Sequence, residues 1–151
     1  MTKRSSTHAT FVIERDYKAT PAEVFAAFAD PKQKAQWFGG PSEWESEHRM
    51  DFRVGGKELS RGGPPGGVVH TMNGEYWDIV ENARIVMAYE LLLDTTRISV
   101  SLGTTEIRPS GAGAKLIYTE QGVYLDGYED AGQREHGTRA LFDQLAAFLA
   151  S

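Results

Sequence analysis

The sequence predicts a single α+β domain in which an antiparallel β-sheet wraps around one long C-terminal helix. Two observations carry this prediction. Residues 42–121 show apolar runs of period two separated by turn residues, which is typical of antiparallel strands. Residues 130–149 instead carry one apolar stripe at helical spacing. Because a sheet with one apolar face needs a covering layer, the helix is expected to pack on the sheet.

The beginning of the chain predicts a polar terminus and then a strand. Residues 1–8 contain no apolar run that could serve as a secretory signal, so they are expected to be disordered. The single folded domain is then residues 9–151. Residues 9–18 alternate, with Phe11, Ile13 and Tyr17 on one face, as in a half-buried strand.

Two short helices are predicted after this strand. Thr20 followed by Pro21 and Glu23 forms the pattern of a capping box with proline at the first helical position, which marks a helix start. Asp30-Pro31 ends the first helix, and residues 32–37 form the second before a glycine-rich turn.

Six more strands complete a predicted seven-stranded sheet. They are placed at residues 43–49, 57–61, 69–80, 84–93, 97–108 and 115–121. The long helix that follows is expected to bury its apolar stripe against this sheet, and its charged residues lie largely off that stripe. The stripe consists of Leu141, Phe142, Leu145 and Leu149, and the charged residues are Arg134, Glu135, Arg139 and Asp143.

Composition excludes several classes of function. The net charge of −5 opposes nucleic-acid binding, which depends on lysine and arginine meeting phosphates. No apolar stretch is long enough for a membrane span. The chain has no cysteine, which excludes disulfides, thiolate metal sites and a cysteine nucleophile. A cytoplasmic protein is the simplest expectation.

Three local motifs, in this order of elements, resemble a known superfamily. They are residues 19–25 running into 37–41 (ATPAEVF and WFGGP), residues 51–56 (DFRVGG), and residues 118–122 (YTEQG) leading into the last helix. Together they span nearly the whole chain. The chain resembles the SRPBCC or START-like superfamily, and within it the AHSA-type (activator of heat-shock-protein ATPase homologue) domains.

This resemblance implies the helix-grip fold. In that fold a curved seven-stranded antiparallel sheet grips the last helix, and the two short helices after the first strand close a cavity between sheet and helix. The superfamily includes lipid carriers, ligand binders, aromatase/cyclases and oxygenase domains, so the resemblance implies a site and no single activity. Eukaryotic co-chaperones of the family also carry an N-terminal domain that this sequence lacks, which disfavours chaperone activation.

No catalytic, metal or cofactor site is predicted. The four histidines, His8, His48, His70 and His136, lack metal-ligand spacing. No serine lies in a Gly-x-Ser-x-Gly setting, and the loop at residues 62–67 lacks the lysine and hydroxyl of a phosphate-binding loop.

The cavity residues are predicted from strand parity together with the implied fold. The predicted lining consists of Trp37, Phe38, Met72, Tyr76, Met87, Tyr89, Leu91, Val100, Tyr118 and Phe142. Two charged residues are added to it. Arg15 and Glu120 share the inward phase of the first and last strands, which should be antiparallel neighbours. Because a buried charge must be paired, an Arg15–Glu120 ion pair is expected.

The leading hypothesis is binding of a hydrophobic or amphipathic small molecule, or of a lipid, in this cavity without dedicated catalytic machinery. Two alternatives stay open. One is a cyclase- or hydrolase-type enzyme that uses the cavity tyrosines with His70 or Glu120 as acid or base. The other is a stress-response or chaperone-interacting protein. The sequence does not predict the oligomeric state.

Overall fold

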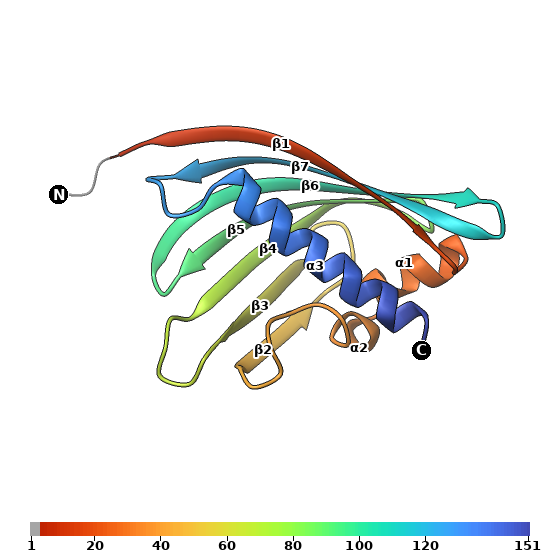
Figure 1. The fold of residues 1–151 in the computed structure, drawn as a ribbon, viewed down its shortest axis with the longest axis horizontal. Helices are drawn as coiled ribbons and strands as arrows, with labels where there is room; N and C mark the ends of the chain where they lie inside the picture. The colour runs from red at the N-terminus through yellow and green to blue at the C-terminus, as the bar shows by residue number, and fades with distance from the viewer. Residues whose placement is uncertain (1–3) are drawn as a thin grey trace.

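The computed structural model of the chain describes residues 4–151 and shows the α+β helix-grip fold that the sequence predicts. The strands are β1 (Ser6–Tyr17), β2 (Glu45–Met50), β3 (Lys57–Gly63), β4 (His70–Val80), β5 (Arg84–Leu93), β6 (Thr96–Ser110) and β7 (Gly113–Leu125). The helices are α1 (Pro21–Ala29), α2 (Pro31–Lys34) and α3 (Ala131–Leu149). All neighbouring strands are antiparallel, in the order β1-β7-β6-β5-β4-β3-β2 (Figure 1).

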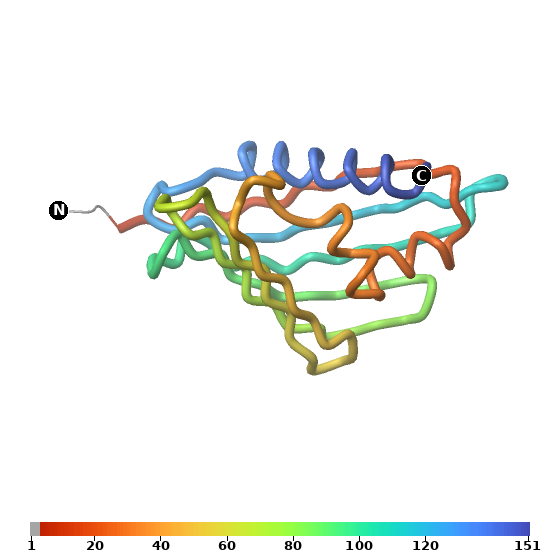
Figure 2. Tube along the Cα trace, turned by 90° about the horizontal axis from the view of Figure 1, so that it is seen from below, coloured from red at the N-terminus to blue at the C-terminus, as the bar shows by residue number. Residues whose placement is uncertain are grey.

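Helix α3 crosses one face of the curved sheet, and α1 and α2 lie near the C-terminal end of α3 (Figure 1). In the view turned by 90°, α3 runs along one side of the sheet while β2 and β3 curl away from it (Figure 2). No helix within residues 4–151 is long and apolar enough to cross a membrane. The face of the sheet that carries α3 is called the inner face below.

The first strand starts earlier than predicted. Residues 6–8 belong to β1 and pair with residues 123–125 of β7, so the expected disorder is wrong for them. Strand β7 also extends beyond the predicted residue 121, and it therefore supplies backbone partners to these residues. Asp126 anchors the same end through Arg4 Nη1 at 2.9 Å and the backbone N–H of Ser5 at 2.9 Å. Residues 1–3 of the predicted terminus lie outside the described residues.

Local capping sets where α1 begins. The Thr20 hydroxyl accepts a hydrogen bond from the Glu23 backbone N–H, and the Glu23 carboxylate accepts one from the Thr20 backbone N–H. The predicted capping box is thereby confirmed. Asp30 ends α1 and caps α2 through the Lys32 backbone N–H at 2.9 Å, so α2 directly follows α1. This short connection places Lys34 and Trp37 on the side of the inner face, where both line the cavity described below.

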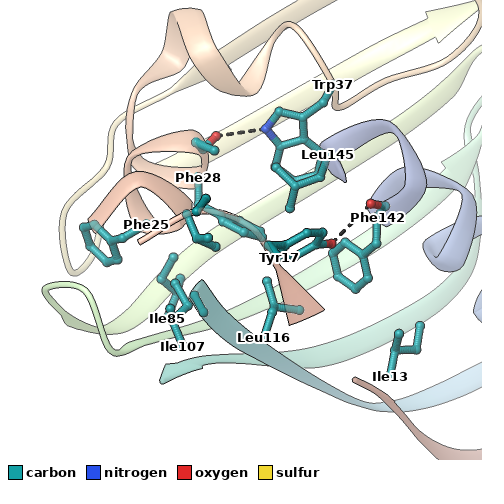
Figure 3. Close-up of a cluster of buried hydrophobic side chains, with 14 of the residues drawn as sticks. Ile13, Tyr17, Phe25, Phe28, Trp37, Ile85, Ile107, Leu116, Phe142 and Leu145 are labelled. Atoms are coloured by element: carbon teal, nitrogen blue, oxygen red, sulfur yellow. Dashed lines mark hydrogen bonds between the residues drawn. The ribbon is translucent and has the colours of Figure 1, made fainter. Parts of the chain in front are cut away.

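The apolar core joins α3, α1 and the inner face of the sheet (Figure 3). Phe142 and Leu145 are buried as predicted, whereas Leu141 and Leu149 are only partly buried. Two hydrogen bonds tie the core to backbone carbonyls: Tyr17 Oη donates to the Phe142 carbonyl at 3.2 Å, and Trp37 Nε1 donates to the Ala27 carbonyl at 3.0 Å. These bonds satisfy polar groups that burial would otherwise leave without a partner.

A β-bulge changes the phase of β6 and corrects one predicted position. Leu91 pairs with Ser99 but Leu92 pairs with Arg97, so Ile98 is an extra residue on β6. Ile98 and Ser99 are both buried, and every later residue faces the side opposite to the one expected. Val100 is 43% exposed on the outer face. The prediction that Val100 lines the cavity is therefore wrong.

Candidate functional site

A cavity of about 340 Å³ lies between the inner face of the sheet and α3. Aromatic and aliphatic side chains make up most of its lining: Phe28, Trp37, Phe38, Phe52, Met72, Ile85, Met87, Leu91, Leu141 and Phe142. Polar side chains from both ends of the cavity complete it: Lys34, Tyr76, Tyr89, Thr105, Tyr118, Glu120, Glu129, Gln133, Arg134 and Thr138.

The structure brings most of the residues singled out from the sequence to this cavity. Those that line it are Trp37, Phe38, Met72, Tyr76, Met87, Tyr89, Leu91, Tyr118, Phe142 and Glu120. Val100 and Arg15 are not among the lining residues. On β4, Met72 and Tyr76 are buried while Trp77 is 60% exposed, so the strand presents the expected phase to the inner face.

Two glycines in the cavity lining shape it in different ways. On the inner face of β6, Gly103 lies so close to Tyr118 that an added Cβ would stand 2.6 Å from its hydroxyl. On α3, Gly137 lines the cavity, and a Cβ there would meet no atom within 4 Å. The lack of a side chain at position 137 therefore keeps part of the cavity open.

A buried ionic cluster, here called the Arg134 cluster, forms one end of the cavity. It consists of Arg134 and Glu129 with Ser99, Ser101, Tyr89, Tyr118 and Glu120. The Arg134 guanidinium bonds Glu129 Oε1 at 2.8 Å, Glu120 Oε2 at 3.1 Å and the Ser99 hydroxyl at 2.6 Å. Its N–H groups are thus directed at protein acceptors, which leaves Arg134 a structural role at the cavity end.

Two tyrosine hydroxyls point at the same carboxylate oxygen in this cluster. Tyr118 Oη and Tyr89 Oη donate to Glu120 Oε1 at 2.6 and 2.8 Å. Burial, reinforced by the nearby Glu120 carboxylate, raises the pKa of both hydroxyls well above the usual value. For Arg134, burial alone would lower the pKa, but Glu129, Tyr89 and Glu120 outweigh it and raise the pKa. The tyrosines therefore remain neutral donors and cannot act as bases near neutral pH.

A second buried polar group, the Glu58 cluster, contributes Lys34 and Tyr76 to the cavity lining. Lys34 belongs to α2, near the C-terminal end of α3, whereas Arg134 lies near the start of α3 (Figure 1). The Glu58 cluster consists of Glu58, Lys34, His48 and Tyr76. Lys34 Nζ lies 2.7 Å from Glu58 Oε1, His48 Nε2 lies 2.8 Å from Oε2, and the Tyr76 hydroxyl donates to Oε1. Burial opposes the charge on Glu58, but Lys34 and the three hydrogen bonds outweigh it and lower the pKa from 4.5 to about 2.

The lowered pKa of Glu58 predicts a loss of stability in acid. A group with a folded-state pKa below its unfolded value stabilises the fold fully above the unfolded value, near 4.5, and loses this contribution as the pH falls toward about 2. We expect the urea midpoint to fall between pH 5 and pH 3 by more in the wild type than in Glu58→Gln, which cannot titrate. Equal falls in the two proteins would show that Glu58 does not contribute in this way.

The predicted Arg15–Glu120 ion pair is wrong. Strands β1 and β7 are neighbours as expected, but Glu120 lies opposite Phe11 and Arg15 lies opposite Leu116. Four residues along a strand separate the two side chains by roughly 13 Å. Arg15 instead reaches α3, where its Nη1 lies 2.6 Å from Asp143 Oδ1. Parity found the correct face of the strand but not the position along it.

Sequence reasoning missed Arg134, Glu58 and Lys34. Arg134 precedes Leu141 by seven residues and Leu145 by eleven, so it lies on the same helical stripe, and that spacing could have identified it. Glu58 and Lys34 carry no such signal, because they meet across elements that are 24 residues apart in sequence. His70, proposed as an acid or base, is exposed and is not among the lining residues.

Comparisons with known proteins agree with the fold. The family described as Activator of Hsp90 ATPase homolog 1-like protein matches residues 18–150. An uncharacterised protein from Rhizobium leguminosarum is 46% identical with a TM-score of 0.93, covering 99% of both chains. The Mll3558 protein from Rhizobium loti is 43% identical with a TM-score of 0.90, covering 96% of this chain and 99% of that one.

A more distant solved structure shares the same architecture. Protein CV1439 from Chromobacterium violaceum is 26% identical with a TM-score of 0.79, covering 94% of this chain and 97% of that one. A comparison with curated proteins finds no match.

Proposed function

The chain belongs to the Activator of Hsp90 ATPase homolog 1-like family, and we propose that it binds an amphipathic small molecule in the cavity between the sheet and α3. The observation that carries this proposal is the cavity itself, whose volume of about 340 Å³ lies within the range of small-molecule sites. A cavity of this size with aromatic walls is costly for a protein to maintain, because filling it with side chains would stabilise the core.

The lining matches what an amphipathic ligand needs. Ligand sites are mainly apolar and hold a few polar groups that set the orientation of the ligand. Here apolar side chains form the walls, while the Arg134 cluster and the Glu58 cluster place polar groups at separate ends. Because each cluster is held by several protein hydrogen bonds, its geometry is set before a ligand enters, and the entropic cost of binding is correspondingly small.

The same geometry argues against the enzyme alternative. The cavity tyrosines are neutral donors, and Glu120 already accepts hydrogen bonds from Tyr89, Tyr118 and Arg134. A general base needs a free acceptor within hydrogen-bond reach of the substrate proton. Binding without turnover is therefore the function that this arrangement supports best.

Filling the cavity from Gly137 should weaken binding strongly without unfolding the protein. Gly137→Leu would project a side chain into open space, and the loss of a helical glycine should raise the stability of α3 by up to about 1 kcal/mol. With the uncharged fluorescent probe N-phenyl-1-naphthylamine, we expect affinity to fall at least about tenfold, which corresponds to about 1.4 kcal/mol.

Gly137→Ala is the matched control. It removes the same glycine and adds a single methyl group, so its probe affinity should stay within about twofold of wild type while its thermal midpoint rises. Wild-type affinity in a folded Gly137→Leu variant would place the probe outside the cavity and contradict the proposal.

A further inference from the structure

We propose that Lys34 hydrogen-bonds a carbonyl oxygen of an uncharged ligand and thereby determines which end of the ligand lies beside α2. This inference rests on the proposed function, since it names the chemistry of a molecule in the same cavity. It starts from a buried ammonium group in the cavity wall. Lys34 is 5% exposed, and it is one of the lining residues.

Lys34 has more donors than the protein uses. An ammonium group carries three N–H donors. Among residues 4–151, the only hydrogen-bond acceptor of Lys34 Nζ is Glu58 Oε1, at 2.7 Å. The Phe38 ring lies 4.5 Å from Nζ and offers its face, which attracts the charge but does not saturate the remaining N–H groups. Lys34 therefore retains donor capacity at a buried position of the cavity wall.

Arg134, the other buried cation of the cavity, differs in this respect. Its guanidinium bonds Glu120, Glu129, Ser99, Ser101 and Tyr89, so its donors are taken by protein groups. Of the two cations that line the cavity, Lys34 is thus the one with donors left for a ligand oxygen. Because burial makes an unmade hydrogen bond costly, an acceptor placed there would contribute strongly to affinity.

The balance of charge favours a neutral acceptor over an anion. The cations Lys34 and Arg134 face three carboxylates, those of Glu58, Glu120 and Glu129. A ligand carboxylate would add a fourth negative charge to a poorly hydrated site, at a high desolvation cost. A ketone, ester or amide oxygen accepts the Lys34 hydrogen bond without that cost. The geometry thus points to an apolar, uncharged carbonyl compound.

Three naphthalene probes separate these possibilities. They are 6-propionyl-2-dimethylaminonaphthalene, which carries a ketone; 2-dimethylaminonaphthalene, which lacks the acyl group; and 6-dimethylamino-2-naphthoate, which carries a carboxylate. We expect wild-type protein to bind the ketone most tightly and the carboxylate more weakly than the ketone. Lys34→Met should weaken ketone binding about tenfold or more, since the hydrogen bond to the buried ammonium group is lost.

The probe without the acyl group is the internal control. Its affinity should change by less than about twofold in Lys34→Met, because it makes no hydrogen bond to Nζ. The carbonyl stretching band of the bound ketone gives a readout that a purely structural role for Lys34 would not move. We expect this band at lower frequency in the wild type than in Lys34→Met.

A second variant controls for the possibility that Lys34→Met does not fold. Lys34→Met leaves the buried Glu58 carboxylate without its cation, so Lys34→Met/Glu58→Gln removes both charges and keeps similar shapes. Circular dichroism identifies which variant is folded, and the folded one is used for the comparison. Unchanged ketone affinity and an unchanged carbonyl band in that variant would overturn the assignment of Lys34.

Failure of the two proposals gives different results. If wild-type protein binds the probe without the acyl group but shows no Lys34-dependent preference for the ketone, the cavity binds ligands and only the role of Lys34 is wrong. If none of the three naphthalenes binds wild-type protein, the proposed function fails and the Lys34 proposal fails with it.

Discussion

Replacing Arg134 with methionine should lower the free energy of unfolding by about 3–5 kcal/mol. The guanidinium is the only partner cation of Glu120 within residues 4–151, and the Glu120 side chain is 1% exposed. Without it, the carboxylates of Glu120 and Glu129 would both lose the cation that they share, and the hydroxyls of Ser99 and Ser101 would lose their common partner. Breaking a buried ion pair from one side is costly because the other charge stays buried.

The same helix offers a matched control. Arg139 is exposed, and its guanidinium pairs with Glu135 one helical turn away at 2.8 Å. Arg139→Met should therefore cost no more than about 1 kcal/mol, as expected for a solvated surface pair. Urea titrations of both variants at neutral pH provide the comparison. Equal losses in the two variants would show that the Arg134 cluster does not stabilise the fold.

Replacing Leu145 with alanine should lower the free energy of unfolding by about 2–5 kcal/mol. Its side chain is completely buried in the core cluster, on the helix that packs against β1 and α1. The truncation would remove apolar contacts and leave a cavity that the surrounding residues can fill only in part.

Gln144, the neighbouring residue on α3, provides the control for this substitution. It is exposed, so Gln144→Ala should change stability by no more than about 0.5 kcal/mol. Both variants are compared by urea titration at the same pH. A loss below about 0.5 kcal/mol for Leu145→Ala would contradict the packing of α3 on the sheet.

The fold could be predicted because its signals are local and repeated. Period-two alternation located the strands to within a few residues, and Thr20 with Glu23 marked the start of α1. The strand ends were less certain, because pairing between strands sets them: β1 continues back to Ser6 since β7 extends to Leu125 opposite it. Such pairing depends on residues more than 100 positions apart.

The candidate site was predictable where a strand keeps one phase along its length. On β5, alternation correctly directed Met87, Tyr89 and Leu91 to the inner face. On β6 it failed for Val100, because the extra residue Ile98 shifts the phase and nothing in the local sequence marks the bulge. The inner face of β6 therefore presents Ser99 and Ser101 to Arg134 instead of valine and leucine.

Partners of buried charges were the least predictable feature. Arg15 and Glu120 each need a partner, and parity alone allowed them to be paired with each other. The register of β1 and β7 separates them, and α3 supplies Asp143 to one and Arg134 to the other. The position of α3 over the sheet determines the ion-pair partners of Arg15 and Glu120. Alternation within a strand carries no information about that position.

The most direct test of ligand binding in the cavity is a methyl NMR titration. Two of the four methionines, Met72 and Met87, line the cavity, whereas Met50 does not. With methyl-¹³C methionine, N-phenyl-1-naphthylamine should shift the Met72 and Met87 signals and show nuclear Overhauser contacts to both methyl groups, and Gly137→Leu should abolish these effects. Probe binding that leaves Met72 and Met87 unperturbed would contradict the account.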